Sequence, residues 1–312
     1  MQIIAKNVSY TYSKNSKSLA TKAIKNISVE IEEGDFFGIV GHTGSGKSTF
    51  IQHLNGLIKL QENSGNIQIG DFDLTSKKCD FKALRSKVGM VFQYPEYQLF
   101  AETVAKDVAF GLKNCRKDLT DEKLIEEEVK YAINLVGLNF DEIKDKSPFE
   151  LSGGQKRRVA IAGVLVLKPE VLILDEPAAG LDPQGKTELM ELLKGLHKSF
   201  VKTIVIVSHD MNLISENCNK VVVFNKGEIV KKGTPKEIFS DIRFIEECGL
   251  DLPVVAYLTQ QLKEVGVNID SDYTLQDFTN KYAMLKGESK WKKWLSDSII
   301  LLARLFTKWT LL

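Results

Sequence analysis

The stretch GHTGSGKST, residues Gly41–Thr49, joins the apolar run FFGIV to the helix-forming segment STFIQHLNGL. It matches the pattern G-x-x-x-x-G-K-[ST], whose glycines let backbone N–H groups approach phosphates, while the following helix N-terminus adds positive potential. The pattern predicts that Lys47 reaches the β- and γ-phosphates of a nucleotide and that Ser48 ligates Mg²⁺. The other residues expected to contact the nucleotide are Gly41, His42, Thr43, Gly44, Ser45, Gly46 and Thr49. The alternative, a glycine-rich turn that binds no ligand, is disfavoured by the strand before the loop and the helix after it.

The composition is that of an ordinary globular protein. The chain has 312 residues, of which 43% are hydrophobic and 27% charged, with a net charge of +1. This balance gives no reason to expect bulk electrostatic attraction to nucleic acid. The cysteines are far apart and form no CxxC pair, which favours a reducing cytoplasm over a disulfide framework or zinc site. The N-terminus lacks the apolar region of a signal peptide, and the run Ile299–Ala303 is interrupted by Arg304, so we expect no membrane span.

Short β-branched runs alternate with helical patterns, which predicts an α/β fold with helices packed on a sheet. The expected strands of this sheet are Phe36–Val40, Val88–Phe92, Val171–Leu174, Thr203–Val207 and Val221–Phe224. An antiparallel β layer is expected from Ile3–Tyr10, Ile27–Ile31 and Asn66–Leu74. The long interval between Ser48 and Val171 leaves room for an inserted helical subdomain, at about residues 94–168.

The stretch VLILDEP, Val171–Pro177, is an apolar strand that ends in two carboxylates. Ligands of open α/β sheets lie at the carboxyl ends of the strands, so this pair is expected to face the phosphates. Asp175 is suited to hold Mg²⁺ through water, and Glu176 to orient and deprotonate an attacking water. The alternative is a strand that ends at an ordinary acidic turn.

The stretch ELSGGQKRRVAIAGVL contains a predicted capping box, since Ser152 is followed three residues later by Gln155. A capping box does not require Gly153 and Gly154. These glycines leave the N–H groups at a helix N-terminus uncovered by side chains, so that these groups could bind a phosphate. Because the phosphate-binding loop already holds the nucleotide in its own subunit, we expect two chains to face one another, with ATP clamped between them.

These motifs, together with GLD at Gly180–Asp182 and VSHD at Val207–Asp210, resemble in order and spacing the nucleotide-binding subunits of ATP-binding-cassette (ABC) transporters, over roughly residues 1–240. The resemblance implies that Tyr12 stacks on adenine, Asp182 contacts the opposing subunit and His209 senses the γ-phosphate. His209 also follows a predicted strand and so falls at the ligand edge of the sheet. For Tyr12, a tyrosine on a half-exposed strand remains the alternative.

The stretch VFQYPEYQLFAETVAKDVAFG, Val91–Gly111, narrows the resemblance to the A-subunit ATPases of energy-coupling-factor transporters, which import vitamins and metal ions such as cobalt. The likeness is strongest to the second of the two paralogous A subunits. It implies that Gln93 contacts Mg²⁺ and the attacking water and links hydrolysis to movement. It also implies a heterodimer of two different ATPases, with a homodimer as the alternative, on the cytoplasmic face of the membrane. A transmembrane T component would dock near Gln93–Phe110, with an exchangeable substrate-binding S component. The aromatics after Gln93 alternatively pack within the helical subdomain.

The C-terminal part predicts two further segments. Residues 241–286 contain two amphipathic helical patterns, which fits a small dimerisation element. Residues 287–312 place tryptophans on one face of a basic amphipathic helix, which could lie in a membrane interface, pack on a protein surface or remain unstructured.

Two other classes of function are alternatives to a transporter ATPase. A soluble cassette ATPase of DNA repair would need long heptad coiled coils, and one of translation usually carries two cassettes in one chain; the sequence has neither feature. A nucleotide-gated scaffold that binds ATP without hydrolysing it is disfavoured by Glu176 and His209.

Overall fold

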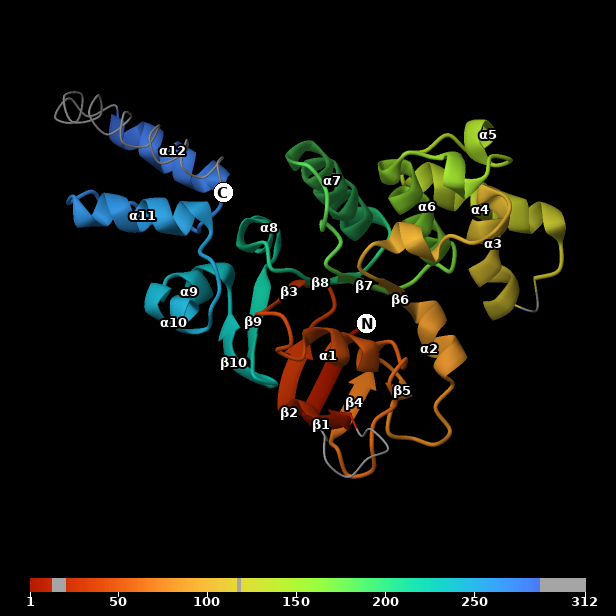
Figure 1. Cartoon of the computed structure of the whole chain (residues 1–312), viewed down its shortest axis with the longest axis horizontal. Coiled ribbons are helices and arrows are strands. Elements are labelled where there is room, and N and C mark those ends of the chain that lie inside the picture. The colour runs from red at the N-terminus through yellow and green to blue at the C-terminus, as the bar shows by residue number, and fades with distance from the viewer. Residues whose placement is uncertain (13–20, 117–118, 287–312) are drawn as a thin grey trace.

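The computed structural model describes residues 1–12, 21–116 and 119–286, which form two β-sheets with helices around them (Figure 1). The larger sheet has six strands in the order β10-β9-β3-β8-β7-β6. Their bounds are β3 Phe36–Val40, β6 Val88–Val91, β7 Val171–Asp175, β8 Thr203–Val207, β9 Lys220–Asn225 and β10 Glu228–Gly233. The α/β fold class predicted from the sequence is confirmed.

The parallel strands β3, β6, β7 and β8 are covered on both faces, as is typical of parallel sheets. Every residue of β3, β6, β7 and β8 is buried, as their continuous apolar runs predict. Neighbours from β9 to β6 pair in parallel register, for example Leu174 with Ile206. Their carboxyl ends therefore lie along one edge of the sheet, where the loops that follow β3, β6, β7 and β8 meet. The edge strand β10 is antiparallel to β9 and was not predicted.

The smaller sheet is antiparallel, in the order β2-β1-β4-β5. Its strands are β1 Ile3–Tyr12, β2 Thr21–Ile31, β4 Asn66–Ile69 and β5 Phe72–Asp73. The single strand expected over 66–74 is wrong, because Gly70 adopts a positive φ of 52° and turns the chain between β4 and β5.

Helix α1, Lys47–Leu54, packs between the two sheets (Figure 1). Its buried Phe50, Ile51 and Leu54 share one hydrophobic core with the small sheet and with Phe37 and Ile39 of β3. Alternate residues of β3 point to the opposite core, beneath the helices on the other face. The core thus fixes the N-terminal end of α1, and the loop before it, against β3.

Helix α2, Phe81–Lys87, comes directly before β6. Between β6 and β7 the chain is helical, with the elements η1 Pro95–Gln98, α3 Val104–Cys115, α4 Glu122–Leu135, α5 Phe140–Ile143, η2 Pro148–Glu150 and α6 Gly153–Leu165. Helices α3, α4 and α6 pack through Val108, Val129 and Val159, all buried. Helix α7, Pro183–Ser199, follows β7, and α8, Met211–Asn217, follows β8.

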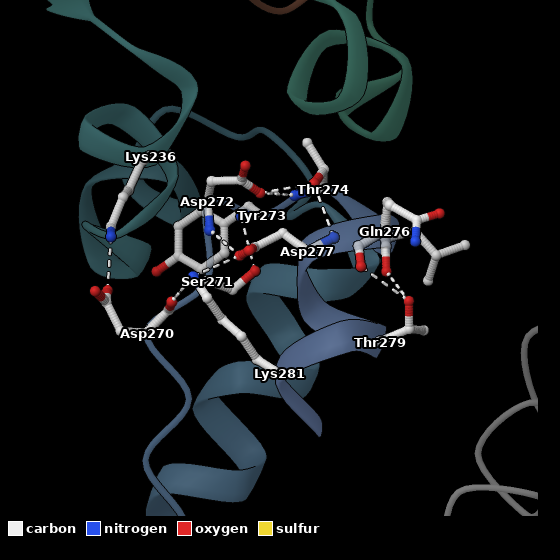
Figure 2. A network of polar contacts seen from close by, with 11 residues as sticks. Lys236, Asp270, Ser271, Asp272, Tyr273, Thr274, Gln276, Asp277, Thr279 and Lys281 are labelled. Carbon is white, nitrogen blue, oxygen red and sulfur yellow. Dashed lines mark hydrogen bonds and ion pairs between the residues drawn. The ribbon is translucent and has the colours of Figure 1, made fainter. Parts of the chain in front are cut away.

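The C-terminal part adds α9 Pro235–Phe239, α10 Ile242–Glu247, α11 Val254–Glu264 and α12 Leu275–Lys286. Helices α11 and α12 share a small core of Val255, Leu262, Val267, Ile269 and Phe278. Figure 2 shows a polar network beside these helices, in which Lys236 of α9 donates to the Asp270 carboxylate at 2.6 Å and Lys281 to the Asp277 carboxylate at 2.8 Å. That residues 241–286 serve in dimerisation stays a prediction, and the basic tail predicted over 287–312 lies outside the described residues. Among the residues that the structure describes, no helix has the length and apolar character needed to cross a bilayer.

Candidate nucleotide site

The loop between β3 and α1 is held by close backbone approaches that only glycine permits. Gly46 has φ 106°, and a Cβ there would lie 2.6 Å from the carbonyl oxygen of Ala23. At Gly41 a Cβ would lie 2.4 Å from the carbonyl oxygen of Phe224. The loop is therefore clamped against β2 on one side and β9 on the other, which fixes the direction of its N–H groups.

The ammonium group of Lys47 lies inside this loop. Its Nζ donates to the carbonyl oxygens of Gly41 at 2.6 Å and His42 at 2.9 Å, and the residue is 8% exposed. Burial lowers the pKa of the Lys47 ammonium, and this outweighs the nearby carboxylates of Glu176 and Asp175, which raise it. A poorly solvated cation beside a glycine-rich loop is suited to receive an anionic group.

Asp175 ends β7 and offers a carboxylate oxygen without a partner. Its Oδ1 is buried and accepts no hydrogen bond, and the residue is 7% exposed. Burial raises the pKa of Asp175, while a hydrogen bond from the Ser48 side chain and the charge of Lys47 lower it. A buried carboxylate oxygen beside an exposed hydroxyl oxygen is a donor set that suits a hard divalent cation, so Asp175 and Ser48 fit Mg²⁺.

Glu176 and His209 lie together at the ends of the neighbouring strands β7 and β8. Nδ1 of His209 is 2.8 Å from Oε2 of Glu176, and the His209 backbone N–H donates to the same oxygen at 3.3 Å. The Glu176 backbone N–H donates to the carbonyl oxygen of Val207 at 2.9 Å, which ties the turn to β8. Glu176 adopts a positive φ of 49°, a conformation rare for a residue with a side chain and frequent at functional sites. The structure therefore brings together four residues expected from the sequence, namely Lys47, Asp175, Glu176 and His209.

Gln93 follows β6 at the same edge of the sheet. Its strand ends at Val91, two residues earlier, and its side chain is exposed. Because β6 pairs with β7 in parallel register, Gln93 leaves the sheet beside the turn that contains Glu176. That it contacts Mg²⁺ and water stays a prediction.

Tyr12 lies next to the first turn of α1. Its hydroxyl is 3.3 Å from Oγ1 of Thr49, its ring meets Tyr10 edge to face at 4.9 Å, and it is 41% exposed. Tyr10 in turn meets the buried ring of His53 at 4.9 Å. An exposed aromatic face beside the phosphate-binding loop fits the expected stacking on adenine, which stays a prediction.

The helix α6 begins with the expected capping box. The Gln155 N–H donates to Ser152 Oγ at 3.3 Å, and the Ser152 N–H donates to Gln155 Oε1 at 3.0 Å. A Cβ at Gly153 or Gly154 would meet no atom within 4 Å, so this helix end faces open space. Figure 1 shows α6 apart from α1, and contact of its N-terminus with a nucleotide held by another subunit stays a prediction. Asp182 N-caps α7 by accepting from Gly185 N–H at 2.7 Å, and its contact with an opposing subunit stays a prediction.

Two polar residues of this region were missed from the sequence. Arg157 is 5% exposed and forms an ion pair with Glu96. No sequence signal singles out Arg157, because it stands in the polar run Gln155–Arg158 at the start of α6, and its partner lies 61 residues earlier.

A buried lysine in a glycine-rich loop, an aspartate and a glutamate at the end of the neighbouring strand, and a histidine beyond them define a P-loop nucleotide hydrolase of the ABC class. The family model described as ABC transporter matches residues 24–179. The energy-coupling factor transporter ATP-binding protein EcfA2 of Clostridium tetani is 49% identical over 272 residues, which cover 87% of this chain and 92% of the relative.

Solved structures agree with this class. CbiO1 from Clostridium perfringens, described as part of the ABC transporter complex CbiONQ, matches with a TM-score of 0.67 and 39% identity, over 83% of this chain and 98% of that one. A dimeric ATP-binding cassette in a post-hydrolysis state with ADP and phosphate matches with a TM-score of 0.66 and 29% identity, over 75% of this chain and 98% of that one. The chain belongs to the energy-coupling factor transporter ATP-binding proteins.

Proposed function

We propose that this chain is the ATP-hydrolysing subunit of an energy-coupling factor importer, bound to the cytoplasmic face of the membrane and powering uptake of vitamins or of metal ions such as cobalt. The observation that carries the proposal is the pairing of Glu176 with His209 at 2.8 Å, beside the buried, unpartnered carboxylate oxygen of Asp175. A site that only held a nucleotide would need the phosphate-binding loop but not this pair.

Within one subunit, the backbone N–H groups of the loop and the Lys47 ammonium would bind the β- and γ-phosphates of ATP. Ser48, Asp175 and Gln93 would hold Mg²⁺, which when bound neutralises part of the phosphate charge. Glu176 would orient a water molecule and accept its proton as the water oxygen attacks the γ-phosphorus and the bond to the ADP oxygen breaks. Nδ1 of His209 is turned to Glu176, which leaves Nε2 on the opposite side of the ring to face the γ-phosphate.

The open N-terminus of α6 supports a two-subunit site. Ser152, Gly153 and Gly154 would contact the γ-phosphate of an ATP held by the loop of a second, paralogous subunit. Two ATP molecules would then close the dimer, and hydrolysis would let it open. The dimeric cassette with ADP and phosphate is a precedent in a related chain.

An exposed aromatic surface supports docking of a membrane component near Gln93–Phe110. Its members are Tyr94 (38% exposed), Tyr97 (84%), Phe100 (59%) and Phe110 (52%), and Phe100 meets Phe110 edge to face at 4.8 Å. Large aromatics left exposed on one surface are typical of a protein interface. A helix of the T component would occupy it, and the S component would bind the transported substrate.

The test is affinity purification of the tagged chain from its native membranes in mild detergent, with Tyr97→Ala and Phe100→Ala variants. We expect the wild type to bring down a paralogous ATPase and a multi-spanning protein, and the variants to lose the multi-spanning protein but retain the ATPase. Tyr131→Ala removes another exposed aromatic, on α4 and 51% exposed, and should leave both partners bound. Recovery of soluble partners alone would contradict the proposal.

A further inference from the structure

Arg157 is a buried arginine that the nucleotide chemistry described above does not use. It lies on the first turns of α6, two residues after the glutamine of the capping box, and is 5% exposed. Burying a guanidinium group removes it from water at a large cost, which is offset only where its N–H groups find partners. Its partners therefore show what the residue is placed to hold.

Those partners lie on two different segments. On one side, Arg157 Nε and Nη2 donate to the two carboxylate oxygens of Glu96, each at 3.3 Å. On the other side, Nη1 donates to the carbonyl oxygen of Pro177 at 2.9 Å, and Nη2 to that of Ala179 at 3.1 Å. One planar group thus joins the η1 segment, which follows Gln93, to the turn that follows Glu176.

The two carbonyl groups belong to the turn that sets the position of Glu176. The Ala179 N–H donates to the carbonyl oxygen of Glu176 at 3.1 Å, so the residues between them form a closed turn. Glu176 adopts its positive φ at the start of this turn. Holding the carbonyls of Pro177 and Ala179 therefore restrains the backbone on the carboxyl side of Glu176, as β8 restrains it on the other side.

A second contact joins the same two segments independently of Arg157. A Cβ built on Gly180 would lie 3.4 Å from Cε1 of Tyr94, so the Tyr94 ring covers the end of the turn. Tyr94 itself adopts a positive φ of 54° at the start of η1. The η1 segment and the turn after Glu176 consequently form one packed unit, with Arg157 as its charged centre.

We propose that Arg157 is a positioning residue that fixes Glu176 through the carbonyls of Pro177 and Ala179, and that it links the placement of Glu176 to η1 through Glu96. The proposal rests on the function proposed above, because η1 lies within the surface assigned to the membrane component. A displacement of η1 in one subunit would then change the geometry of hydrolysis in that subunit. The guanidinium fork suits this task because its N–H groups point in fixed directions to several acceptors at once, which a lysine ammonium on a flexible stem does not reproduce.

The test compares Arg157→Lys, Arg157→Gln and Glu96→Gln in the full chain, purified with its co-purifying subunits. Because displacement of a catalytic group by about 1 Å can cost about 100-fold in rate, we expect kcat for ATP hydrolysis to fall by about 10- to 100-fold. KM for ATP and binding of a fluorescent ATP analogue should stay within about threefold of the wild type, since none of these side chains is assigned to the nucleotide. The Arg157→Gln/Glu96→Gln double variant should be no slower than the slower single variant, because both changes break the same link.

Arg158→Gln is the matched control. Arg158 is the next residue on α6 and also bonds a carbonyl, that of Val136 at 3.0 Å, and a carboxylate, Glu188 at 3.0 Å, but neither lies on the turn after Glu176. It should leave kcat within about twofold of the wild type, the limit expected when no interaction with the transition state is lost. If Arg157→Gln does not fold, Glu96→Gln, which keeps the size of the side chain, decides the matter alone.

Unchanged kcat in Glu96→Gln, or an equal loss in Arg158→Gln, would overturn the inference. These outcomes are distinct from failure of the proposed function, in which the wild-type complex itself would not hydrolyse ATP or would contain no membrane protein. A wild-type complex that hydrolyses ATP alongside fully active Glu96→Gln and Arg157→Gln variants would refute only the role of Arg157.

Discussion

Oε2 of Glu176 contacts His209 twice: Nδ1 of the ring lies 2.8 Å away, and the backbone N–H donates to the same oxygen at 3.3 Å. Since Glu176 follows β7 and His209 follows β8, the register between these parallel strands sets the position of the carboxylate. The ring is 73% exposed and the carboxylate 14%, so the histidine stands between Glu176 and solvent, where a substrate phosphate would arrive.

Replacement of His209 by alanine should lower kcat with little change in KM for ATP. Loss of a group that acts in proton transfer or its positioning typically costs about 10²- to 10⁴-fold in rate, whereas most of the contacts that bind ATP would come from the phosphate-binding loop. Single-turnover hydrolysis together with equilibrium ATP binding measures both quantities. The control is His197→Gln. His197 lies in α7 and packs on Phe36 of β3, away from Glu176, so this change should keep kcat. A parallel loss of binding in His209→Ala would contradict this role.

Replacement of Lys47 by methionine should abolish ATP binding but change the stability of the free protein little, because the desolvation cost of the ammonium and its hydrogen bonds to the loop carbonyls are lost together. The methionine keeps an unbranched apolar chain in the buried site, while the ammonium, whose pKa burial already lowers, is removed. Calorimetric titration with ATP and thermal unfolding without nucleotide measure the two effects. Lys198→Met, at an exposed position of α7, should bind ATP normally. Retained ATP affinity in Lys47→Met would remove this lysine from the site.

Replacement of Gly46 by alanine should destabilise the protein by roughly 2 to 4 kcal/mol, from the left-handed backbone and overpacking together. The added Cβ would meet the Ala23 carbonyl oxygen at 2.6 Å. Gly195 is the control because it lies in α7 with open space around it, so Gly195→Ala should stabilise by roughly 0.5 to 1 kcal/mol. Denaturant unfolding of both variants gives the comparison. Equal effects of the two changes would show that the loop is not clamped.

Acid should destabilise the protein in part through His53. This residue is fully buried, and burial lowers its pKa from 6.5 to about 4. Between these values the unfolded chain binds a proton that the folded chain does not, so stability is retained above pH 6.5 and lost as the pH falls toward 4. The loss should approach roughly 3 kcal/mol.

His53→Gln tests this contribution. Its free energy of unfolding should depend less on pH between 6.5 and 4 than that of the wild type, as measured by urea unfolding at a series of pH values. Identical pH dependences in the two proteins would contradict the neutral, buried state of His53.

The sequence predicted those parts of the site that follow from local chemistry. The glycine-rich loop, the carboxylates after an apolar strand and the capping box at Ser152 are each encoded within a few residues, and parallel strands bring their ends to one edge. It did not predict the edge strand β10, whose residues 228–233 lack an apolar pattern because one face meets solvent. The ion pair of Arg157 with Glu96 was also missed, since a contact between residues 61 apart depends on packing of α6 against η1 and not on either local pattern.

The most direct test of the central claim is ATP hydrolysis by the purified membrane complex with wild-type chain, with Glu176→Gln and with the control Glu191→Gln, an exposed carboxylate on α7. We expect the wild type and Glu191→Gln to release phosphate at equal rates. Glu176→Gln should bind ATP with wild-type affinity and lose at least about 100-fold in kcat, as expected for a missing general base. Hydrolysis at the wild-type rate in Glu176→Gln would contradict the assignment of this edge of the sheet as the site that powers transport.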